Sequence, residues 1–367
     1  MEGYMPAAVT RQTNRRKVYQ YIYQKSGAVT AAELAEALSL EQAAVEGGLA
    51  SLLEEGMIIR EKDSACVLEP RGRVAVGMFL RDDGIQLLAL DMRAEELGFQ
   101  ELSLPFAHTP EYYQTVARRL EEFIDVSGLD RDRLLGVGIA IPAIIDQTAG
   151  RLVRSPTLEL WDLPLEEIYS HFSHYPTFIE NSPNASGYAA RWMNRERTNV
   201  IYLSLDRGVG GAIIQGDGQY MGDHGRGGEF GHMRLVPDGR LCSCGRRGCV
   251  EAYCSISRLS DDLGITLREF FTRLQAGDRQ AAAVWEEYRT HLVDTLVNLR
   301  TCFDCDIILG GELSSYLEGL LPELCWELGE KTFFEEDSLF LQLDRFGSRS
   351  VCAGSALRFI DDFLLTY

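Results

Sequence analysis

The sequence predicts a winged helix-turn-helix domain followed by a mixed α/β fold with a ligand cleft. Residues 1–63 show helical spacing of apolar side chains and end in short apolar runs. After residue 73, apolar strand patterns alternate with helical patterns, and glycines stand at the ends of several strands. Alternating strands and helices with glycine-rich turns are typical of α/β folds that hold ligands at their strand ends.

The N-terminal domain is predicted from three helical segments and a hairpin. Thr30 and Glu33 form the pattern of a capping box, in which two side chains satisfy free amides at the start of a helix. The apolar runs after the third segment would pair as the wing. A generic small helical domain is the alternative. The expected elements are helices over 10–24, 30–38 and 39–53, the third opened by Ser39, and strands over 57–60 and 65–68.

The α/β region is expected to begin after Pro70-Arg71-Gly72-Arg73, which has the composition of a linker. Its second strand, 85–91, is nearly continuously apolar, which is typical of a strand buried on both faces. The expected strands cover 74–79, 85–91, 134–141, 176–180, 200–205, 211–215 and 306–309. The expected helices cover 112–126, 183–195, much of 256–300, and 353–365.

Composition and charge narrow the class of protein. The 367 residues include 55 acidic and 36 basic side chains, which give a formal net charge of −19. This charge disfavours broad non-specific attraction to nucleic acid or anionic membranes, but it allows a small DNA-binding domain joined to an acidic body. No apolar run approaches the roughly 18–20 residues of a membrane span. No apolar signal core follows Met1. We therefore expect a cytoplasmic protein without a membrane partner.

One cluster stands out among the nine cysteines. Cys242, Cys244 and Cys249 lie within one octapeptide, and His232 precedes the first of them by ten residues. Three thiolates and one imidazole complete the tetrahedral shell of Zn²⁺ and leave no open position, so a structural zinc site is expected and not a hydrolytic one. The remaining cysteines are dispersed, as expected for reduced thiols. The alternative is a coincidental group of thiols in a loop.

Around this cluster the sequence resembles the ROK family, which groups sugar kinases with sugar-responsive repressors. The resemblance rests on residues 228–233, on the cysteine motif through Glu251, and on residues 136–142 followed by Asp146 and Gly150. It covers nearly the whole chain and implies a two-lobed actin-like or hexokinase-like (ribonuclease H-like) ATPase fold. The implied domains are a DNA-binding domain over 1–70, a first lobe over 71–195 and 350–367, and a second lobe with the zinc site over 196–349.

The resemblance places sugar-binding roles on Asn181, Glu229, His232 and Glu251. Carboxylates accept hydrogen bonds from sugar hydroxyls, and an amide both accepts and donates. His232 could ligate zinc through one ring nitrogen and donate to the sugar through the other. The alternatives are solvated surface carboxylates for the two glutamates and a helix cap for Asn181, which directly precedes a helical pattern.

The same resemblance implies that kinase chemistry is lost. The family's catalytic aspartate sits in a Glu-Asn-Asp-x-Asn run, where this chain has Ser182, and serine cannot take a proton from a sugar hydroxyl at neutral pH. The first phosphate loop aligns with residues 79–83, which lack glycine and include Asp82 and Asp83. The second phosphate turn holds Asp206 and Arg207 in place of Gly-Thr. Carboxylates at both loops would repel phosphate, so no kinase activity is expected.

The chemistry needed to read DNA is only partly present in the N-terminal domain. A basic cluster on the first helix would contact phosphates, and it consists of Arg11, Arg15, Arg16 and Lys17. The candidate contact positions on the third helix are Gln42, Ala43 and Glu46. The family usually has Thr-Val-Ser-Arg near the start of that helix, and Gly47 replaces the arginine that would read guanine. The helix-turn-helix shape is thus better supported than base recognition.

These features lead to three hypotheses. The first is a sugar-responsive transcriptional regulator of the repressor type, with operator DNA and a sugar effector as partners, structural zinc as cofactor, and a homodimer or homotetramer as its assembly. The second is a sugar-binding or interaction module whose helix-turn-helix no longer reads DNA. The third, an active sugar kinase, is disfavoured by Ser182 and the altered phosphate loops. We adopt the first; the sequence does not name the sugar.

Overall fold

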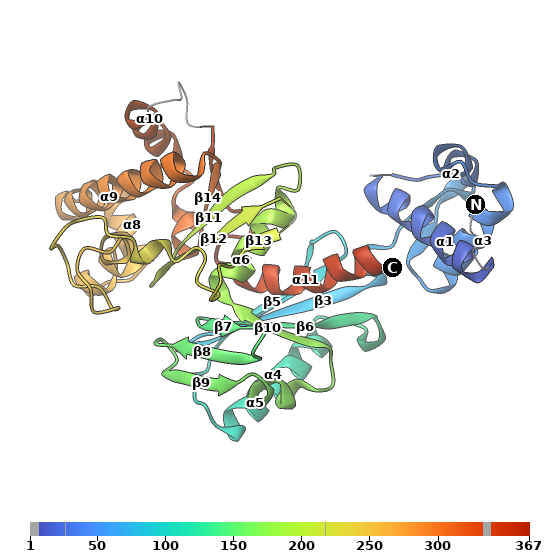
Figure 1. Ribbon diagram of the computed structural model, residues 1–367, viewed down its shortest axis with the longest axis horizontal. Helices are drawn as coiled ribbons and strands as arrows, with labels where there is room; N and C mark the ends of the chain where they lie inside the picture. Colours follow the sequence, from blue (N-terminus) through green and yellow to red (C-terminus); the bar gives the residue numbers. More distant parts are fainter. Residues whose placement is uncertain (1–6, 26, 217, 333–338) are drawn as a thin grey trace.

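The computed structural model describes residues 7–25, 27–216, 218–332 and 339–367. A small N-terminal helical domain lies beside one end of a two-lobed α/β body, and helix α11 runs from between the lobes toward that domain (Figure 1). None of the helices in these described ranges is both long and apolar enough to cross a membrane.

The N-terminal domain has three helices and an antiparallel hairpin, the arrangement predicted for a winged helix-turn-helix. Val18, Ile22, Leu34 and Leu49 meet in its buried core. Apolar residues at helical spacing therefore direct one face of each helix inward. The elements are α1 (Ala7–Gln24), α2 (Ala31–Leu38), α3 (Gln42–Glu54), β1 (Ile58–Arg60) and β2 (Cys66–Leu68).

The expected start of the third helix is wrong. Ser39 ends α2 in the left-handed conformation (φ 52°, ψ 45°), and α3 begins only at Gln42. A serine side chain often caps the start of a helix, but the sequence around Ser39 does not show that the chain turns at this residue.

One of the two hydrogen bonds expected of the capping box at the start of α2 is confirmed, because the Thr30 hydroxyl accepts from the Glu33 amide at 3.2 Å. The Glu33 carboxylate instead pairs with Lys25.

The first lobe is built on a five-stranded sheet in the order β10-β6-β3-β4-β5. Helix α4 (Pro110–Val126) packs on one face of the sheet through an apolar stripe. The strands are β3 (Val74–Leu80), β4 (Gly84–Asp91), β5 (Glu96–Ser103), β6 (Leu134–Ile141) and β10 (Thr177–Asn181). A second, three-stranded sheet joins β7 (Ile144–Asp146), β8 (Arg151–Ser155) and β9 (Leu160–Pro164), followed by the short α5 (Glu166–Tyr169). Sequence patterns missed β5 and β7 to β9, because these strands are short or largely half-exposed.

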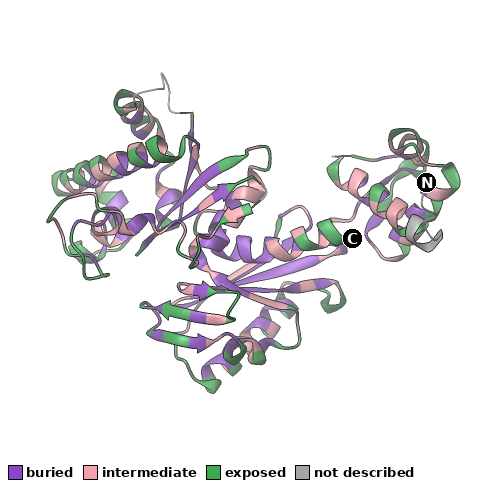
Figure 2. Cartoon of the chain, viewed as in Figure 1, coloured by how far each residue is buried: buried purple, intermediate pink, exposed green. Residues whose placement is uncertain are grey.

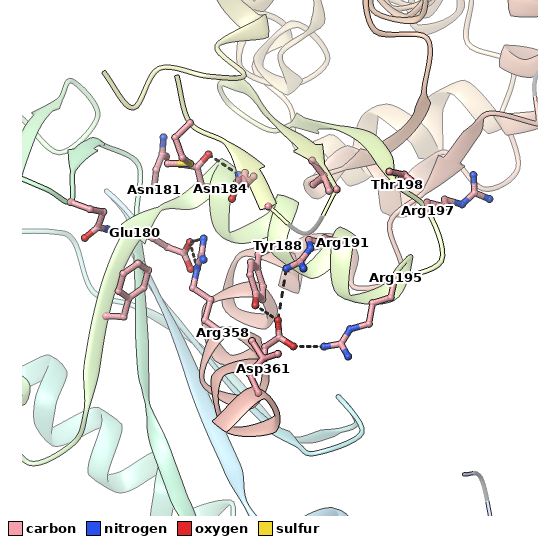
Figure 3. A pocket seen from close by; sticks show the side chains of 18 of the residues that line it. Glu180, Asn181, Asn184, Tyr188, Arg191, Arg195, Arg197, Thr198, Arg358 and Asp361 are labelled. Atoms are coloured by element: carbon pink, nitrogen blue, oxygen red, sulfur yellow. Dashed lines mark hydrogen bonds and ion pairs between the residues drawn. The ribbon is translucent and has the colours of Figure 1, made fainter. Parts of the chain in front are cut away.

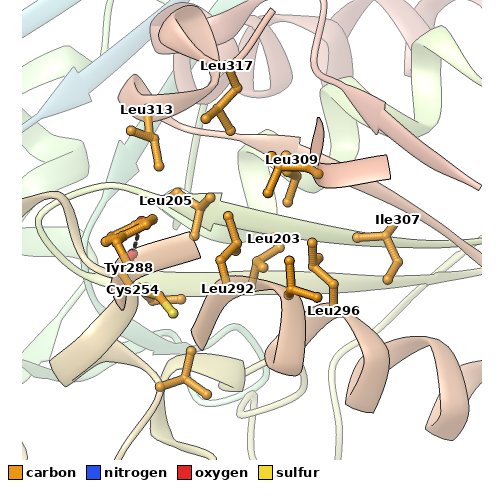
Figure 4. Packing of buried hydrophobic residues seen from close by; sticks show 14 of the residues in the cluster. Leu203, Leu205, Cys254, Tyr288, Leu292, Leu296, Ile307, Leu309, Leu313 and Leu317 are labelled. Atoms are coloured by element: carbon orange, nitrogen blue, oxygen red, sulfur yellow. Dashed lines mark hydrogen bonds between the residues drawn. The ribbon is translucent and has the colours of Figure 1, made fainter. Parts of the chain in front are cut away.

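The second lobe repeats this plan with a sheet in the order β13-β12-β11-β14-β15. Figure 4 shows Leu203 and Leu309 of the sheet packed against Leu292 and Leu296 of the long helix α9. Figure 2 shows the central strands as buried and the outer face of α9 as exposed. The strands are β11 (Asn199–Leu205), β12 (Val209–Gln215), β13 (Gly218–Tyr220), β14 (Asp306–Gly310) and β15 (Leu341–Leu343). The helices are α7 (Glu251–Cys254), α8 (Leu267–Gln275), α9 (Arg279–Phe303) and α10 (Leu321–Lys331).

Helices α6 (Ser182–Met193) and α11 (Ser350–Thr366) pack against each other between the lobes. Their backbones approach closely because a Cβ on Gly354 would overlap the Ala185 carbonyl oxygen. Helix α11 also lies tightly on the first sheet, where a Cβ on Gly77 or Gly138 would overlap carbonyls of the helix. Small residues thus let one helix contact both a sheet and a second helix.

The end of α11 reaches the N-terminal domain. The Tyr367 ring lies 5.1 Å from the Tyr19 ring, its hydroxyl donates to Glu55 at 2.6 Å, and the Arg15 guanidinium stands 4.3 Å from its centre. The segment predicted as a linker is also packed, since Gly72 is buried and the Pro70 carbonyl accepts from the Met92 amide at 3.0 Å. The helix-turn-helix is therefore docked on the α/β body.

Substitution Gly354→Ala is expected to lower the stability of the chain by about 1–3 kcal/mol, because an added methyl group in a closely packed crossing forces the helices apart. A lower melting temperature in calorimetry would report it. The matched control is Gly329→Ala in α10, where a Cβ meets nothing within 4 Å. That control should stabilise by up to about 1 kcal/mol through helix propensity. Equal melting temperatures for the two variants would contradict the role of the crossing.

Candidate functional site

The loop between β13 and α7 brings the predicted ligand set together. One ligand atom from each of His232, Cys242, Cys244 and Cys249 lies within 4.8 Å of the others. The sulfurs of Cys244 and Cys249 are 3.7 Å apart, and Cys242 Sγ is 3.8 Å from His232 Nδ1. A tetrahedral ion with metal–sulfur bonds of about 2.3 Å needs sulfurs about 3.8 Å apart. The residues therefore fit a tetrahedral metal ion.

Two glycines allow the chain to fold into this loop. Gly245 and Gly248 have φ values of +83° and +79°, which other residues rarely adopt. A Cβ on Gly248 would also overlap the Val236 carbonyl oxygen. The turn is closed by the Cys242 amide, which donates to the Arg246 carbonyl at 2.8 Å.

The electrostatics of the loop favour thiolates only in part. Burial raises the pKa of the Cys244 thiol, but hydrogen bonds from the backbone amide and side chain of Arg246 outweigh it and lower the pKa to about 6. Burial raises the pKa of the Cys242 and Cys249 thiols. A bound divalent cation would favour all three thiolates. Cys254 lies outside this group, buried in α7, as the sequence predicted.

Three of the four predicted sugar-binding residues lie together beside the metal cluster. His232 Nδ1 faces Cys242, and His232 Nε2 lies 3.9 Å from Glu229 Oε2. Glu251 is oriented by the Val209 amide at 3.2 Å and the Ser243 hydroxyl at 2.6 Å. Burial raises the pKa of Glu229, and His232 partly offsets this. Two carboxylates and an imidazole edge form a surface that suits hydroxyl groups.

Asn181, the fourth residue, lies in the first lobe at the end of β10. It occupies the N-cap position of α6, but its side chain makes no capping hydrogen bond. Pro183, two residues on, packs closely over Gly210, because a Cβ there would lie 2.6 Å from the proline ring. Gly210 neighbours Val209, whose amide holds Glu251. The fold thus brings Asn181 and Glu251 to the same end of β12.

The positions that align with phosphate loops are filled by internal contacts. One oxygen of Asp206 accepts from the Glu312 amide at 2.7 Å, and the other accepts from the Ser204 hydroxyl at 2.7 Å. On the facing lobe, Arg81 in the β3–β4 turn pairs with Asp83 and with Glu101, each at 2.8 Å. The Asp206 carboxylate and the Arg81 guanidinium are therefore both paired within the chain.

The predicted DNA-contacting residues fall into two groups. Arg11 and Lys17 are exposed on α1, and Gln42, Ala43 and Glu46 are exposed on α3. Gln42 donates to Glu46 at 2.9 Å along that face.

The other two basic residues face α11. Arg15 pairs with Glu55 and Tyr367, and Arg16 donates to the Leu365 carbonyl. Their contact with DNA stays a prediction.

Sequence patterns missed a pocket of about 820 Å³ that lies between α6, α11 and the β12–β13 hairpin (Figure 3). Arg191, Arg195, Arg358 and Asp361 are among its lining residues. A weak signal was present, since the predicted helix 183–195 holds Arg191 and Arg195 four residues apart, and Arg358 and Asp361 are three apart in the closing helix. The sequence alone does not indicate that these two helices meet.

Comparison with known proteins gives consistent results. A model described as the ROK family matches residues 83–334. The xylose repressor of Bacillus subtilis (strain 168) is 27% identical over 271 residues, which make up 70% of each chain. A solved ROK family transcriptional regulator, a homologue of the E. coli MLC protein, has a TM-score of 0.75 at 20% identity and covers 97% of this chain and 98% of its own. The ROK hexokinase of Thermus thermophilus has a TM-score of 0.62 at 25% identity, covering 79% and 99%. The predicted hexokinase-like fold is thereby confirmed.

The purified chain is expected to carry one divalent metal ion, and Cys244→Ser should lose it. Loss of a ligand should weaken binding at least as much as loss of an outer hydrogen bond, which costs about tenfold to a hundredfold. Elemental analysis and the melting temperature would report both effects. Cys302→Ser is the matched control, because Cys302 is also exposed but lies outside the cluster. Full metal content in Cys244→Ser would refute the ligand set.

Proposed function

The chain belongs to the ROK family, whose model matches residues 83–334, and we propose that it is a sugar-responsive transcriptional repressor without kinase activity. The observation that carries this proposal is the docking of a winged helix-turn-helix onto α11, the helix that also packs between the lobes. A change in the angle between the lobes would therefore move the DNA-facing helices. The name of the related xylose repressor from Bacillus subtilis supports the same function.

A sugar is the proposed effector, bound by Asn181, Glu229, His232 and Glu251. The fixed orientation of Glu251 supports this role, since its carboxylate is held by a backbone amide and a hydroxyl. Glu229 and Glu251 would accept from sugar hydroxyls, and His232 Nε2 would donate. Because Asn181 belongs to β10 and the other three residues to the second lobe, a sugar between them would draw the lobes together.

Zinc is the proposed metal, with a structural role. A Cys₃His set is typical of closed tetrahedral zinc sites. Nδ1 of His232 lies toward Cys242, which leaves Nε2 directed at the sugar side. The ion would tie the loop to His232 and so keep Glu229 and Glu251 on either side of the ring. The proposed domains are 1–70, 71–195 with 350–367, and 196–349, the last of which holds the metal.

Operator DNA is the proposed partner, contacted by Arg11 and Lys17 at the backbone and by α3 in the groove. The exposure of both basic side chains supports this role. A helix-turn-helix protein that reads two half-sites needs two copies, so the active form would be a homodimer or a homotetramer. Arg15 and Arg16 would join the DNA contact only if α11 releases them.

A second candidate function is a sugar-binding or interaction module that no longer reads DNA. Two observations favour it. Glu46 and Gly47 are exposed on α3, and Gly47 stands where the family usually has an arginine that would read guanine. Arg15 is held by Glu55 and Tyr367, which removes one cation from the phosphate-facing set. This function predicts sugar-dependent thermal stabilisation without any affinity for DNA.

The chain should bind DNA from the region upstream of its own gene at low salt, and the affinity should change when sugars are added. Fluorescence anisotropy would measure both. Replacing Arg11 and Lys17 by alanine should weaken binding to all DNA sequences alike. The slope of log affinity against log salt concentration should become less steep by about one unit for each lost phosphate contact. The control is Arg118→Ala, an exposed arginine on α4. If no genomic fragment binds at low salt, the repressor proposal fails and the second candidate remains.

No sugar-dependent turnover of ATP is expected from this chain. The variant Ser182→Asp should stay inactive as well, because Asp206 still occupies the Glu312 amide and Arg81 to Asp83 still form a turn without glycine. A coupled ADP assay with pentoses and hexoses would test both forms, with the Thermus thermophilus ROK hexokinase as a positive control. Turnover by the unmodified chain would contradict the proposed loss of activity.

A further inference from the structure

The pocket between α6, α11 and the β12–β13 hairpin has the chemistry of a second ligand site. Its wall combines residues of both lobes with residues of the two helices that join them (Figure 3). Asn181 lines it, whereas the other three proposed sugar-binding residues do not. Its volume of about 820 Å³ is within the range of small-molecule sites. We propose that it binds a small polyhydroxylated anion, such as a sugar phosphate or a sugar acid.

One end of the pocket has more cationic donors than internal acceptors. Asp361 is shared by Arg195 at 2.6 Å, Arg191 at 3.8 Å and the hydroxyl of Tyr188 (Figure 3). Each guanidinium carries five donors in a fixed plane. Arg195 is 46% exposed and Arg191 is 24% exposed, so both retain access to a ligand. Among the lining residues, four arginines stand against the carboxylates of Glu180, Glu196 and Asp361, which leaves a net positive charge that suits a phosphate or carboxylate group.

The other two arginines of the wall contribute less, because each has a partner of its own. Arg358 pairs with Glu180 at 2.6 Å, and Arg197 pairs with Asp306 from the second sheet. The anionic group of the ligand is therefore assigned to Arg191 and Arg195.

Two other lining residues carry oxygen atoms that accept no hydrogen bond from the described residues. Glu180 is only 3% exposed, and its Oε1 has no hydrogen-bond partner among the described residues. Gln219 donates to Asn184 at 3.0 Å, but its own carbonyl oxygen also lacks a partner within the described part of the chain. Unsatisfied buried acceptors are costly, and ligand hydroxyl groups would satisfy them. A hydroxylated ligand with a charged end matches both imbalances.

Ligand binding here would act on α11. Arg358 and Asp361 belong to this helix, and Tyr367 at its end holds Arg15 of the N-terminal domain. An anion that draws Arg191 and Arg195 away from Asp361 would change the seating of the last turns of α11. This regulatory step rests on the proposed DNA-binding function; the binding site itself does not.

Calorimetric titration of the full chain tests the site. The probes are D-glucose 6-phosphate, D-gluconate, inorganic phosphate and neutral D-glucose. Each is titrated into the unmodified chain and then into the Glu251→Gln variant, which disables the proposed sugar site. At least one of the two polyhydroxylated anions should bind more tightly than inorganic phosphate and D-glucose, and the tighter one identifies the charged group. In the same background, Arg191→Gln or Arg195→Gln should weaken that binding about tenfold. Arg118→Gln on α4 is the control and should not alter it.

A second variant is expected to raise anion affinity, which misfolding could not do. Asp361→Asn removes the internal competitor while its carbonyl can still accept from Tyr188, so anion affinity should rise several-fold. The site is refuted by absence of binding at millimolar ligand, by binding that disappears with Glu251→Gln alone, or by equal binding of the arginine variants and the control. Inorganic phosphate or D-glucose binding as tightly as both polyhydroxylated anions would also refute it. These outcomes concern binding only, so they leave the repressor proposal to its own DNA test.

Discussion

The close crossing of α6 and α11 is the contact on which the rest of the structure depends. Gly354 allows the two helix backbones to meet, and Gly77 and Gly138 allow α11 to rest on the first sheet. Interiors are packed densely, so a helix that touches both neighbours this tightly moves with them and not independently. The same helix ends at Thr366, and Tyr367 directly after it contacts Tyr19 of the N-terminal domain. One rigid element therefore contacts the sheet of the first lobe, the helix that leads to the second lobe, and the helix-turn-helix.

The cleft of this fold combines two kinds of polar chemistry. On one side, Glu229 and Glu251 lie beside the His232 and cysteine cluster and form the proposed sugar site with His232. On the other side, Asp206 uses both of its oxygens on donors of the chain itself. The Glu312 amide and the Ser204 hydroxyl thus find their acceptor in a carboxylate of the chain. These internal contacts agree with the proposal that this hexokinase-like fold serves recognition.

The four basic residues of the predicted DNA-contacting cluster on α1 lie on two different surfaces. Arg11 and Lys17 are exposed, whereas Arg15 and Arg16 contact the end of α11. Ion pairs of partly exposed side chains are weak, so the contact at Tyr367 is well suited to a reversible change. DNA phosphates and the last turn of α11 would compete for the same two guanidinium groups. Under the proposed DNA-binding function, the strength of DNA binding and the position of α11 would be linked through Arg15 and Arg16.

The sequence by itself determined the features that depend on neighbouring residues. The metal cluster could be predicted because three of its ligands lie in one octapeptide, and the hairpin wing because its strands follow each other directly. Only the tertiary structure decided the contacts between distant segments. Glu180 and Arg358 are 178 residues apart, and Asp206 and the Glu312 amide are 106 apart. Ser39 shows the same limit at short range, since a residue that suits a helix start instead ends α2 in the left-handed conformation. Local patterns report propensity and spacing, whereas the pocket at α6 and α11 exists only because two helices meet at small residues.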